Sequence, residues 1–307
     1  MAKILVVGSY VTDLMSRTPH MPRPGETVLG GPFQMGPGGK GGNQAVAAAR
    51  LGSEVTMVTK VGHDVFGDEA IKNFENENIQ SEFITRHPTE VTGTALIAVD
   101  KEFENIIVVA PGACGTINRE DVYRAEQSFI DADIVLLQLE TSLEAVTHTI
   151  NLAYEHEKTI VLNPAPFREV SDDLLSKIDY ITPNETEAYW LTGIEVVDEV
   201  TAKAASEALI NKGVKNVVIT LGKLGAFVYE EDGTHYMVDA YQVEVADTTG
   251  AGDAFNGGLA TYVARGEALK EAVIKSNAVA ALAVTKVGTA PAMPYENEVE
   301  QFLQNRN

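Results

Sequence analysis

The chain of 307 residues is short of cysteine and of long apolar runs. Its one cysteine, Cys114, excludes an intrachain disulfide and any metal site built from several thiolates. No run approaches the ~18 apolar residues that a membrane-spanning helix needs. The N-terminus, MAKILVVGSY, predicts a first strand and not a signal peptide, because its apolar run is brief and ends in Gly-Ser. We therefore expect no membrane partner and a cytoplasmic location.

Positive charge is also scarce. The chain has 23 Lys and Arg residues against 44 Asp and Glu residues, which gives a formal net charge of −21 at pH 7. A surface of this charge repels phosphate backbones, so we expect no nucleic acid partner. Any site for a phosphorylated ligand must then draw its positive potential from a local source. Backbone N–H groups at helix N-termini can supply it.

Short β-branched runs alternate with helical patterns along most of the chain. The later runs are almost continuously apolar, as in a parallel sheet that is covered on both faces. This alternation predicts an α/β sandwich with a central, mainly parallel sheet flanked by helices. Strands are expected at 3–9, 55–62, 133–140, 159–165, 180–184 and 216–222, and helices at 42–51, 68–78, 119–130, 143–156, 185–191, 202–212, 250–265, 269–286 and 297–305.

Two segments interrupt the alternation. Residues 12–36 are rich in Pro and Gly, and residues 82–110 contain three strand-like runs with no helix between them. Antiparallel strands inserted into a parallel fold usually form a separate small sheet. We therefore expect one domain over residues 1–307, with both segments forming a small β lid over one edge.

A glycine-rich segment, GPGGKGGN, precedes a predicted Ala-rich helix. Gly36, Gly38 and Gly41 fit the spacing G-x-G-x-x-G of dinucleotide-binding turns, but no strand-forming run leads directly into them. A P-loop is excluded, because Gln34 occupies the place of its first glycine and Gly41 that of the Ser or Thr after the lysine. The segment favours close backbone approach to a small polar ligand, and a plain turn before a core helix is the alternative.

The segment DTTGAGDAFNGG at 247–258 is the most informative. Gly250, Ala251 and Gly252 open an apolar helix and leave N–H groups free to form an anion hole. Asp253 falls in the first helical turn. It is either a helix N-terminal charge, worth about 0.3–1 kcal/mol, or a general base for phosphoryl transfer. Its small-residue surroundings favour the general base.

Taken together, these motifs resemble those of the ribokinase family of PfkB-type carbohydrate kinases. DTTGAGDAFNGG resembles the second family signature and GPGGKGGNQAVAAARLG the first. PNETEAYWLTG (183–193) is similar to the Asn-x-x-Glu motif, and VVITLGKLGAF (217–227) to the nucleotide-binding strand and turn. The motifs follow the family order over essentially the whole chain. The resemblance implies a ribokinase-like three-layer sandwich with a β lid that often forms a homodimer.

The resemblance also implies roles for individual residues. Asp253 is the expected base, beside an anion hole of Gly250, Ala251 and Gly252. Mg²⁺ is expected near Glu187, although a helix-capping Asn184 with a surface Glu in the next turn is the alternative. The residues expected to contact ATP are Asn184, Thr220, Gly222, Gly225, Gly252 and Asn277. A monovalent cation, K⁺, is expected at Asp247 and Thr249 and at the backbone of Ala283, Lys286 and Gly288.

For the sugar, the family positions match Val11, Asp13, Gly39, Lys40, Asn43, Glu140 and Asp253. Ribokinases typically carry Asn where this chain has Val11. A sugar hydroxyl left unpaired against Val costs roughly 1–3 kcal/mol, so an apolar residue suits a sugar with one hydroxyl fewer. The run DLMSRTPHMPRPGET also resembles the deoxyribokinases of this family. We therefore expect ATP-dependent phosphorylation of 2-deoxy-D-ribose at the 5-hydroxyl, with D-ribose as the nearest alternative.

Three other functions compete with this one. A fructokinase or nucleoside kinase of the same superfamily is the nearest. A nicotinamide-dependent oxidoreductase would use the G-x-G-x-x-G match but leaves DTTGAGD unexplained. A non-catalytic sugar sensor on a kinase fold would not need Asp253 or the anion-hole glycines, and both are present.

Overall fold

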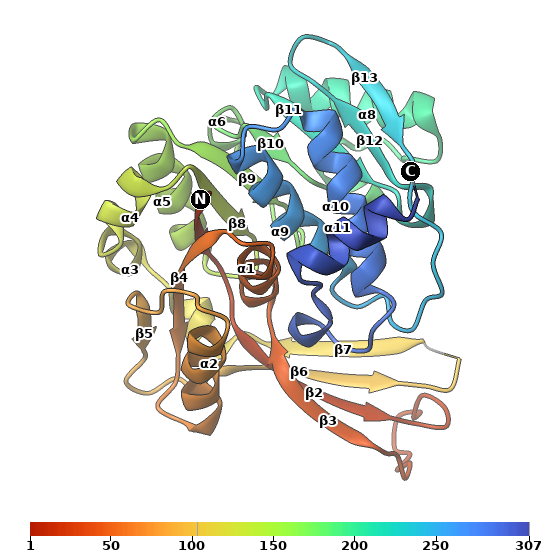
Figure 1. The fold of residues 1–307 in the computed structure, drawn as a ribbon. Coiled ribbons are helices and arrows are strands. Elements are labelled where there is room, and N and C mark those ends of the chain that lie inside the picture. The colour runs from red at the N-terminus through yellow and green to blue at the C-terminus, as the bar shows by residue number, and fades with distance from the viewer. Residues whose placement is uncertain (103, 307) are drawn as a thin grey trace.

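The computed structural model describes residues 1–102 and 104–306. Residue 103 of the predicted lid segment and residue 307 at the end of the predicted domain lie outside the described part. A nine-stranded sheet runs through its centre in the order β13-β12-β11-β10-β9-β8-β1-β4-β5 (Figure 1). All neighbours from β11 to β5 pair in parallel, which confirms the predicted mainly parallel sheet. The strands of this sheet are β1 Lys3–Val7, β4 Glu54–Val61, β5 Ile84–Arg86, β8 Ile134–Gln138, β9 Thr159–Asn163, β10 Tyr180–Ile181, β11 Asn216–Thr220, β12 Ala226–Tyr229 and β13 His235–Val238.

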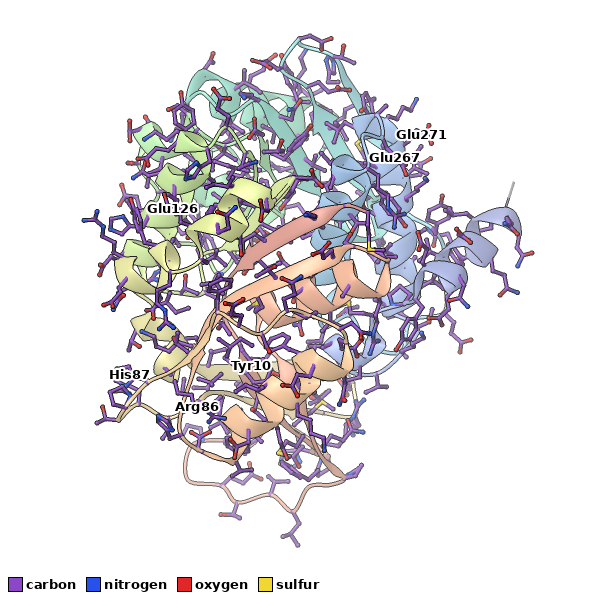
Figure 2. The ribbon with its side chains drawn as sticks, turned by 60° about the vertical axis from the view of Figure 1, so that its left-hand side comes forward. Tyr10, Arg86, His87, Glu126, Glu267 and Glu271 are labelled. Carbon is purple, nitrogen blue, oxygen red and sulfur yellow. The ribbon has the colours of Figure 1, made fainter. Side chains whose placement is uncertain are left out.

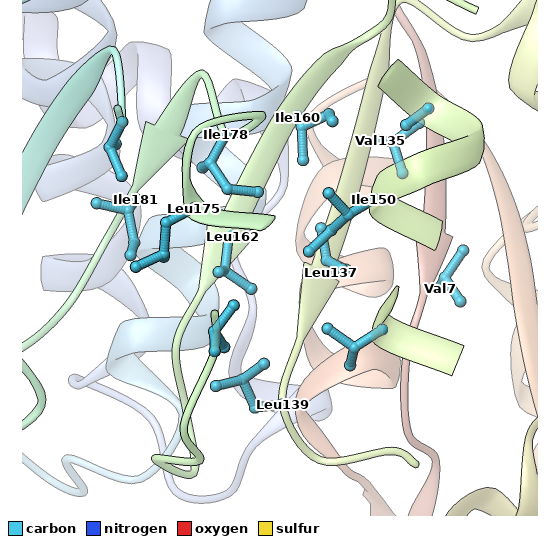
Figure 3. Close-up of a cluster of buried hydrophobic side chains, with 14 of the residues drawn as sticks. Val7, Val135, Leu137, Leu139, Ile150, Ile160, Leu162, Leu175, Ile178 and Ile181 are labelled. Atoms are coloured by element: carbon cyan, nitrogen blue, oxygen red, sulfur yellow. The ribbon is translucent and has the colours of Figure 1, made fainter. Parts of the chain in front are cut away.

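Helices cover both faces of the large sheet, and each face has its own core. One face packs on α3 Arg119–Tyr123, α4 Glu126–Asp131, α5 Leu143–Glu155, α6 Asp172–Leu175, α7 Glu185–Thr192 and α8 Glu199–Asn211. The other packs on α1 Lys40–Arg50, α2 Val65–Asn76, α9 Ala251–Ala264, α10 Leu269–Ala283 and α11 Glu296–Gln304. Alternate residues of a strand point to opposite faces, so Val135 and Leu137 lie in the first core (Figure 3) and Ile134 and Leu136 in the second. Within the described ranges, no helix is both long and apolar enough to cross a bilayer.

A second sheet of four strands, ordered β3-β2-β6-β7, projects from the main body (Figure 1). Its strands are β2 Val11–Arg17, β3 Phe33–Gly38, β6 Gly93–Val99 and β7 Asn105–Ala110. They come from the two segments that interrupt the α/β alternation, as expected for a small separate sheet. One difference is that β2 and β6 pair in parallel, while the outer pairs are antiparallel.

The first strand-like run of the 82–110 segment does not join the small sheet, so this part of the predicted lid is wrong. β5 pairs in parallel with β4 at the edge of the large sheet. Arg86 and His87, labelled in Figure 2, stand at its end. The guanidinium of Arg86 donates to the carbonyl of Gly62 at 2.8 Å and reaches Asp68 of α2 at 2.5 Å. These bonds hold the short strand against the main body.

Two further expectations need correction. A strand, β3, does lead into the glycine-rich segment, but it belongs to the small antiparallel pair with β2, so no dinucleotide-type βαβ unit forms there. The predicted helix at 119–130 is divided into α3 and α4, because the chain tightens at Ala125, whose N–H donates to Val122 O at 3.1 Å.

The strands β12 and β13 were not predicted. The Asp-Gly pair at 232–233 between them is a hairpin signal that could have indicated them.

Helices α1 and α9 approach each other closely. A Cβ atom at Gly257 would lie 2.6 Å from the Cβ of Ala47 and 2.7 Å from the carbonyl oxygen of Gln44. Only glycine allows this distance without displacing α1. Because Gly257 lies one turn after Asp253, the contact brings the start of α9 next to the first turn of α1.

Candidate active site

A cavity of about 760 Å³ lies beneath the small sheet. Its lining contains every residue that the sequence predicted for the sugar. They are Val11, Asp13, Gly39, Lys40, Asn43, Glu140 and Asp253. The structure therefore brings together side chains from segments more than 200 positions apart in the chain.

The inner face of the small sheet forms one wall of this cavity. Val11 and Asp13 are two positions apart on β2, so both point to the same side of the sheet. Ala95 and Ile97 of β6 continue this wall. The wall is apolar except at Asp13, which makes this carboxylate a specific hydrogen-bonding point for a polar ligand.

Asp13 is held from the other side by Thr289, whose Oγ1 donates to Asp13 Oδ2 at 2.9 Å. Burial raises the pKa of Asp13 to about 6, against the lowering effect of the Thr289 bond. The carboxylates of Glu140, Asp253 and Asp247 raise it further. Several acidic groups thus share one cavity.

Lys40 is a cation that lines the same cavity as these carboxylates. Burial alone would lower the pKa of its ammonium group, but Asp253, Glu140 and Glu187 together hold the pKa above its ordinary value. The backbone N–H of Lys40 also donates to Glu140 Oε2 at 2.9 Å, and Ser9 Oγ donates to the same oxygen at 2.5 Å. These two bonds fix the carboxylate of Glu140, which lies just after the end of β8.

Asp253 is 6% exposed and bonds two side-chain amides of α1. Asn43 Nδ2 donates to its Oδ2 at 2.9 Å, and Gln44 Nε2 donates to its Oδ1 at 3.0 Å. Both carboxylate oxygens therefore have a donor, and the carboxylate still borders the cavity. A helix N-terminal charge would not need this arrangement, which suits a carboxylate of fixed orientation.

The start of α9 has the form predicted for an anion hole. Gly250 precedes the helix with φ +80°, a conformation that glycine adopts without strain, and no side chain caps the helix. In the described part of the chain, neither the N–H of Gly252 nor that of Asp253 donates to a backbone carbonyl. These donors and the positive end of the helix dipole are free to meet an anion.

A second cavity, of about 200 Å³, lies on the other side of Asp253. It is lined by Gly250, Ala251 and Gly252 at the start of α9 and by Asn184, Glu187 and Thr220. Lys40, Gly250 and Asp253 line both cavities. The carboxylate, the cation and the helix N-terminus thus stand at the junction between the two.

Asn184 and Glu187 form a capping box at the start of α7. Asn184 Oδ1 accepts from Glu187 N at 2.8 Å, and Glu187 Oε2 accepts from Asn184 N at 3.0 Å. The capping half of the alternative interpretation is therefore correct, but Glu187 is no surface residue, since it is 8% exposed. Burial raises its pKa, against the Asn184 bond and Lys40.

Not all of the other residues expected to contact the nucleotide border the two cavities. Thr220 lies beside Asn184 through a β-bridge, whereas Gly222, Gly225 and Asn277 do not line either cavity among the described residues. Asn277 Nδ2 donates to Val238 O at 3.2 Å and Asp239 O at 3.1 Å, which ties α10 to the end of β13. Gly225 has φ +102°, and a Cβ atom there would collide with Val238 O.

Only some of the residues expected at the cation site are hydrogen-bonded to one another. Asp247 Oδ1 accepts from the N–H and the hydroxyl of Thr249, at 2.9 and 2.7 Å, and its Oδ2 accepts from Gly288 N at 3.1 Å. Ala283 ends α10, and Lys286 Nζ bonds Glu298 at 2.7 Å. In the described ranges, no group of three or more His, Cys, Asp or Glu side chains could hold a metal ion.

Several polar residues of the site were not predicted, among them Gln44, Gln138, Asn163 and Thr289. Two of them carry a recognisable signal. Gln44 interrupts an Ala-rich helix, and Gln138 interrupts the apolar strand IVLLQ, and both are fully buried. A polar side chain at a core position of either element needs a partner, which marks it as a candidate.

Comparisons with known proteins agree with this geometry. The family model described as pfkB family carbohydrate kinase matches residues 1–296. A ribokinase of Haemophilus influenzae is 41% identical over 302 residues, and a deoxyribokinase of Salmonella typhi is 39% identical over 301 residues; each alignment covers 98% of both chains. A ribokinase of Arabidopsis thaliana is similar in structure, with a TM-score of 0.91 at 27% identity over 99% of each chain. The predicted ribokinase-like fold is confirmed, and the oxidoreductase alternative is wrong.

The raised pKa of Asp13 predicts how this residue affects stability. Because the folded-state pKa of about 6 exceeds the ordinary value of 3.8, the ionised carboxylate destabilises the fold above about pH 6, and this cost disappears as pH falls toward 4. We expect Asp13→Asn to raise the free energy of unfolding by about 2–3 kcal/mol at pH 8 and by roughly a third of that at pH 4.5.

Urea unfolding of both proteins at the two pH values measures this difference. Asp131→Asn, at an exposed acid of α4, is the control and should change neither value. Equal effects of Asp13→Asn at both pH values would contradict the prediction.

Proposed function

Because the chain belongs to the pfkB family of carbohydrate kinases and is an ATP-dependent sugar kinase, we propose that it phosphorylates a pentose at the 5-hydroxyl. The products are ADP and the sugar 5-phosphate. 2-Deoxy-D-ribose is the proposed main substrate and D-ribose the nearest alternative. A fructokinase or nucleoside kinase activity is a more distant alternative, since the two relatives compared above are named as a ribokinase and a deoxyribokinase.

The shared lining of the two cavities is the observation that carries this proposal. Lys40, Gly250 and Asp253 border both the larger cavity, which suits a sugar, and the smaller one, which suits phosphate groups. A phosphoryl group that passes between two substrates must cross such a junction in line with the attacking hydroxyl. The ribokinase of Arabidopsis thaliana was solved in complex with ribose and ATP, which supports a site for a sugar and a nucleotide in this fold.

The mechanism follows from the positions of the side chains. Asp13, Asn43 and Glu140 hold the secondary hydroxyls of the sugar beneath the small sheet, which acts as the lid. Asp253 accepts the proton of O5 while O5 attacks the γ-phosphoryl of ATP. The free N–H groups at the start of α9 and the ammonium of Lys40 stabilise the charge on the transferred group. The nucleotide extends past Asn184 and Thr220 toward Gly222, Gly225 and Asn277.

Mg²⁺ and K⁺ are proposed to accompany ATP. The buried carboxylate of Glu187 borders the phosphate cavity, and a single carboxylate with phosphate and water oxygens suits the coordination of Mg²⁺. When bound, Mg²⁺ neutralises charge on the phosphate oxygens. For K⁺, the carbonyl end of α10 at Ala283 and the loop around Asp247 and Gly288 offer oxygen ligands close together. A cytoplasmic location stays a prediction.

Replacing the proposed base tests the function. We expect Asp253→Asn to fold normally, because the amide retains the shape of the carboxylate and Asn43 can turn its unpartnered Oδ1 toward the new NH₂ group, but to lose at least about 1000-fold in kcat. ADP release with Mg-ATP and 2-deoxyribose measures the loss, and near-ultraviolet circular dichroism checks the fold. Turnover within about tenfold of the wild type would refute the role of Asp253.

The choice of sugar rests on Val11, which is 2% exposed and lines the sugar cavity on β2. We expect the unmodified enzyme to have a higher kcat/KM for 2-deoxyribose than for ribose. Val11→Asn should lower the ratio of the two values by about tenfold or more, because the amide can pair with the additional hydroxyl.

Val109→Asn places an amide elsewhere on the same wall and is the matched control, which should affect both sugars equally. If the unmodified enzyme prefers ribose, the deoxyribokinase assignment is wrong and the kinase assignment stands.

A homodimer through the small sheet is the last part of the proposal. The face of this sheet away from the cavity is apolar, with Met35, Leu96, Ile106 and Val108 largely exposed. Leu96 lies directly opposite Val108, so these side chains form one continuous surface. We expect sedimentation velocity to give a dimer and Leu96→Glu to give a monomer, because a charge at the centre of an apolar interface is costly. A monomeric wild type at micromolar concentration would contradict the proposal.

A further inference from the structure

A chain of buried amides extends from Asp253. Among the described residues, Gln44 and Gln138 line neither cavity, whereas Asn163, Thr182 and Asn256 further along the chain border the smaller one. Gln44 and Gln138 are 0% exposed, so neither can touch a substrate. Gln44 Nε2 donates to Asp253 Oδ1 at 3.0 Å and to Asn163 Oδ1 at 3.1 Å. Both N–H groups of this amide are therefore used, one of them on the carboxylate proposed as the base.

Gln138 fixes which way the amide of Gln44 faces. Gln138 Nε2 donates to Gln44 Oε1 at 2.7 Å. An inverted Gln44 amide would direct its NH₂ group at that donor and its oxygen at the Asp253 carboxylate, and both contacts would be repulsive. Space for Gln138 exists because residue 8 is glycine, where a Cβ atom would collide with Gln138 Oε1.

The network returns to the start of α9. Asn163 Nδ2 donates to Thr182 O at 3.3 Å, and Thr182 Oγ1 donates to Asn256 Oδ1 at 2.6 Å. Asn256 Nδ2 then donates to Gly252 O at 2.8 Å. The carboxylate of Asp253 and the peptide of Gly252, beside the anion hole, are thus linked through buried side chains from α1, β9, the end of β10 and α9.

We propose that Gln44 is a positioning residue that holds the Asp253 carboxylate at the junction of the two cavities, and that Gln138 orients Gln44 for this task. The inference rests on the proposed role of Asp253. Asn43 and Gln44 each donate to a different carboxylate oxygen, so rotation of the carboxylate would break both bonds. Fixed orientation favours proton acceptance from a hydroxyl at one place.

A purely structural role for these amides makes a different prediction. Breaking a buried hydrogen-bond network lowers stability wherever it lies. Loss of position at Asp253 must instead change kcat and its dependence on pH, and leave the affinity for the sugar nearly unchanged. Kinetics across pH therefore separate the two roles.

Gln44→Glu is the decisive variant, because it preserves shape and replaces the donor with a carboxyl group about 3 Å from Asp253. Two carboxyl groups this close do not both ionise near neutral pH, so the pair retains a proton. We expect kcat at pH 7 to fall at least about tenfold and the acid limb of the kcat profile to move up by at least about one pH unit. KM for the sugar should stay within about threefold, because Gln44 does not reach the cavity.

Gln138→Glu tests the residue that lies one hydrogen bond further from Asp253. The introduced carboxylate accepts from the NH₂ group of Gln44 and turns the amide oxygen toward Asp253, so kcat should fall again with KM unchanged. Asp121→Asn is the matched control. It makes a carboxylate–amide exchange at another buried site, where Asp121 pairs with Lys60 at 2.5 Å. It should lower the melting temperature and leave the acid limb in place.

The outcomes separate the inference from the proposal on which it rests. If Asp253→Asn is inactive and both glutamine variants lose only thermal stability, the positioning role is overturned and the base assignment stands. If Asp253→Asn keeps its activity, both are overturned. A shifted acid limb in Gln44→Glu, absent from Asp121→Asn, supports the positioning role.

Discussion

The contact between helices α1 and α9 is the constraint on which the site depends. Gly257 lets the two helices approach so closely that a single methyl group would separate them. That distance brings Asn43 and Gln44 of α1 within hydrogen-bonding reach of Asp253 on α9. The same helix start supplies the unpaired N–H groups beside the carboxylate. One helix–helix contact thus places the carboxylate of Asp253, the two amides that donate to it and the anion hole next to one another.

The strongly acidic composition explains why the site is built from backbone donors. With a net charge of −21, the chain cannot rely on a general positive field to attract a nucleotide. Among the described residues, Lys40 is the basic side chain that lines both cavities, and Asp253, Glu140 and Glu187 hold the pKa of its ammonium group above its ordinary value. The helix dipole and the free amides of α9 add positive potential without long side chains, which leaves room for the transferred group.

Much of this arrangement could be predicted from the sequence, and the misses have physical causes. The continuous apolar strands and the motif at 247–258 indicate the fold and the position of Asp253, because both depend on local pattern. The predicted place of β5 in the small sheet is wrong, because a three-residue strand carries too little sequence pattern to show that it pairs with β4. The bond between Gln44 and Asp253 joins residues 209 positions apart, and no local pattern reveals such a pair. The capping box of Asn184 and Glu187 was visible, but the burial of Glu187 was not.

The central claim is that Asp253 accepts the proton of the sugar hydroxyl at the junction of two substrate cavities. A crystal structure with 2-deoxyribose and a non-hydrolysable ATP analogue tests it most directly. We expect O5 of the sugar within about 3 Å of an Asp253 carboxylate oxygen, with the γ-phosphoryl group facing the N–H groups of Gly252 and Asp253. A sugar that binds with O5 turned away from Asp253, or with another hydroxyl in its place, would contradict the account.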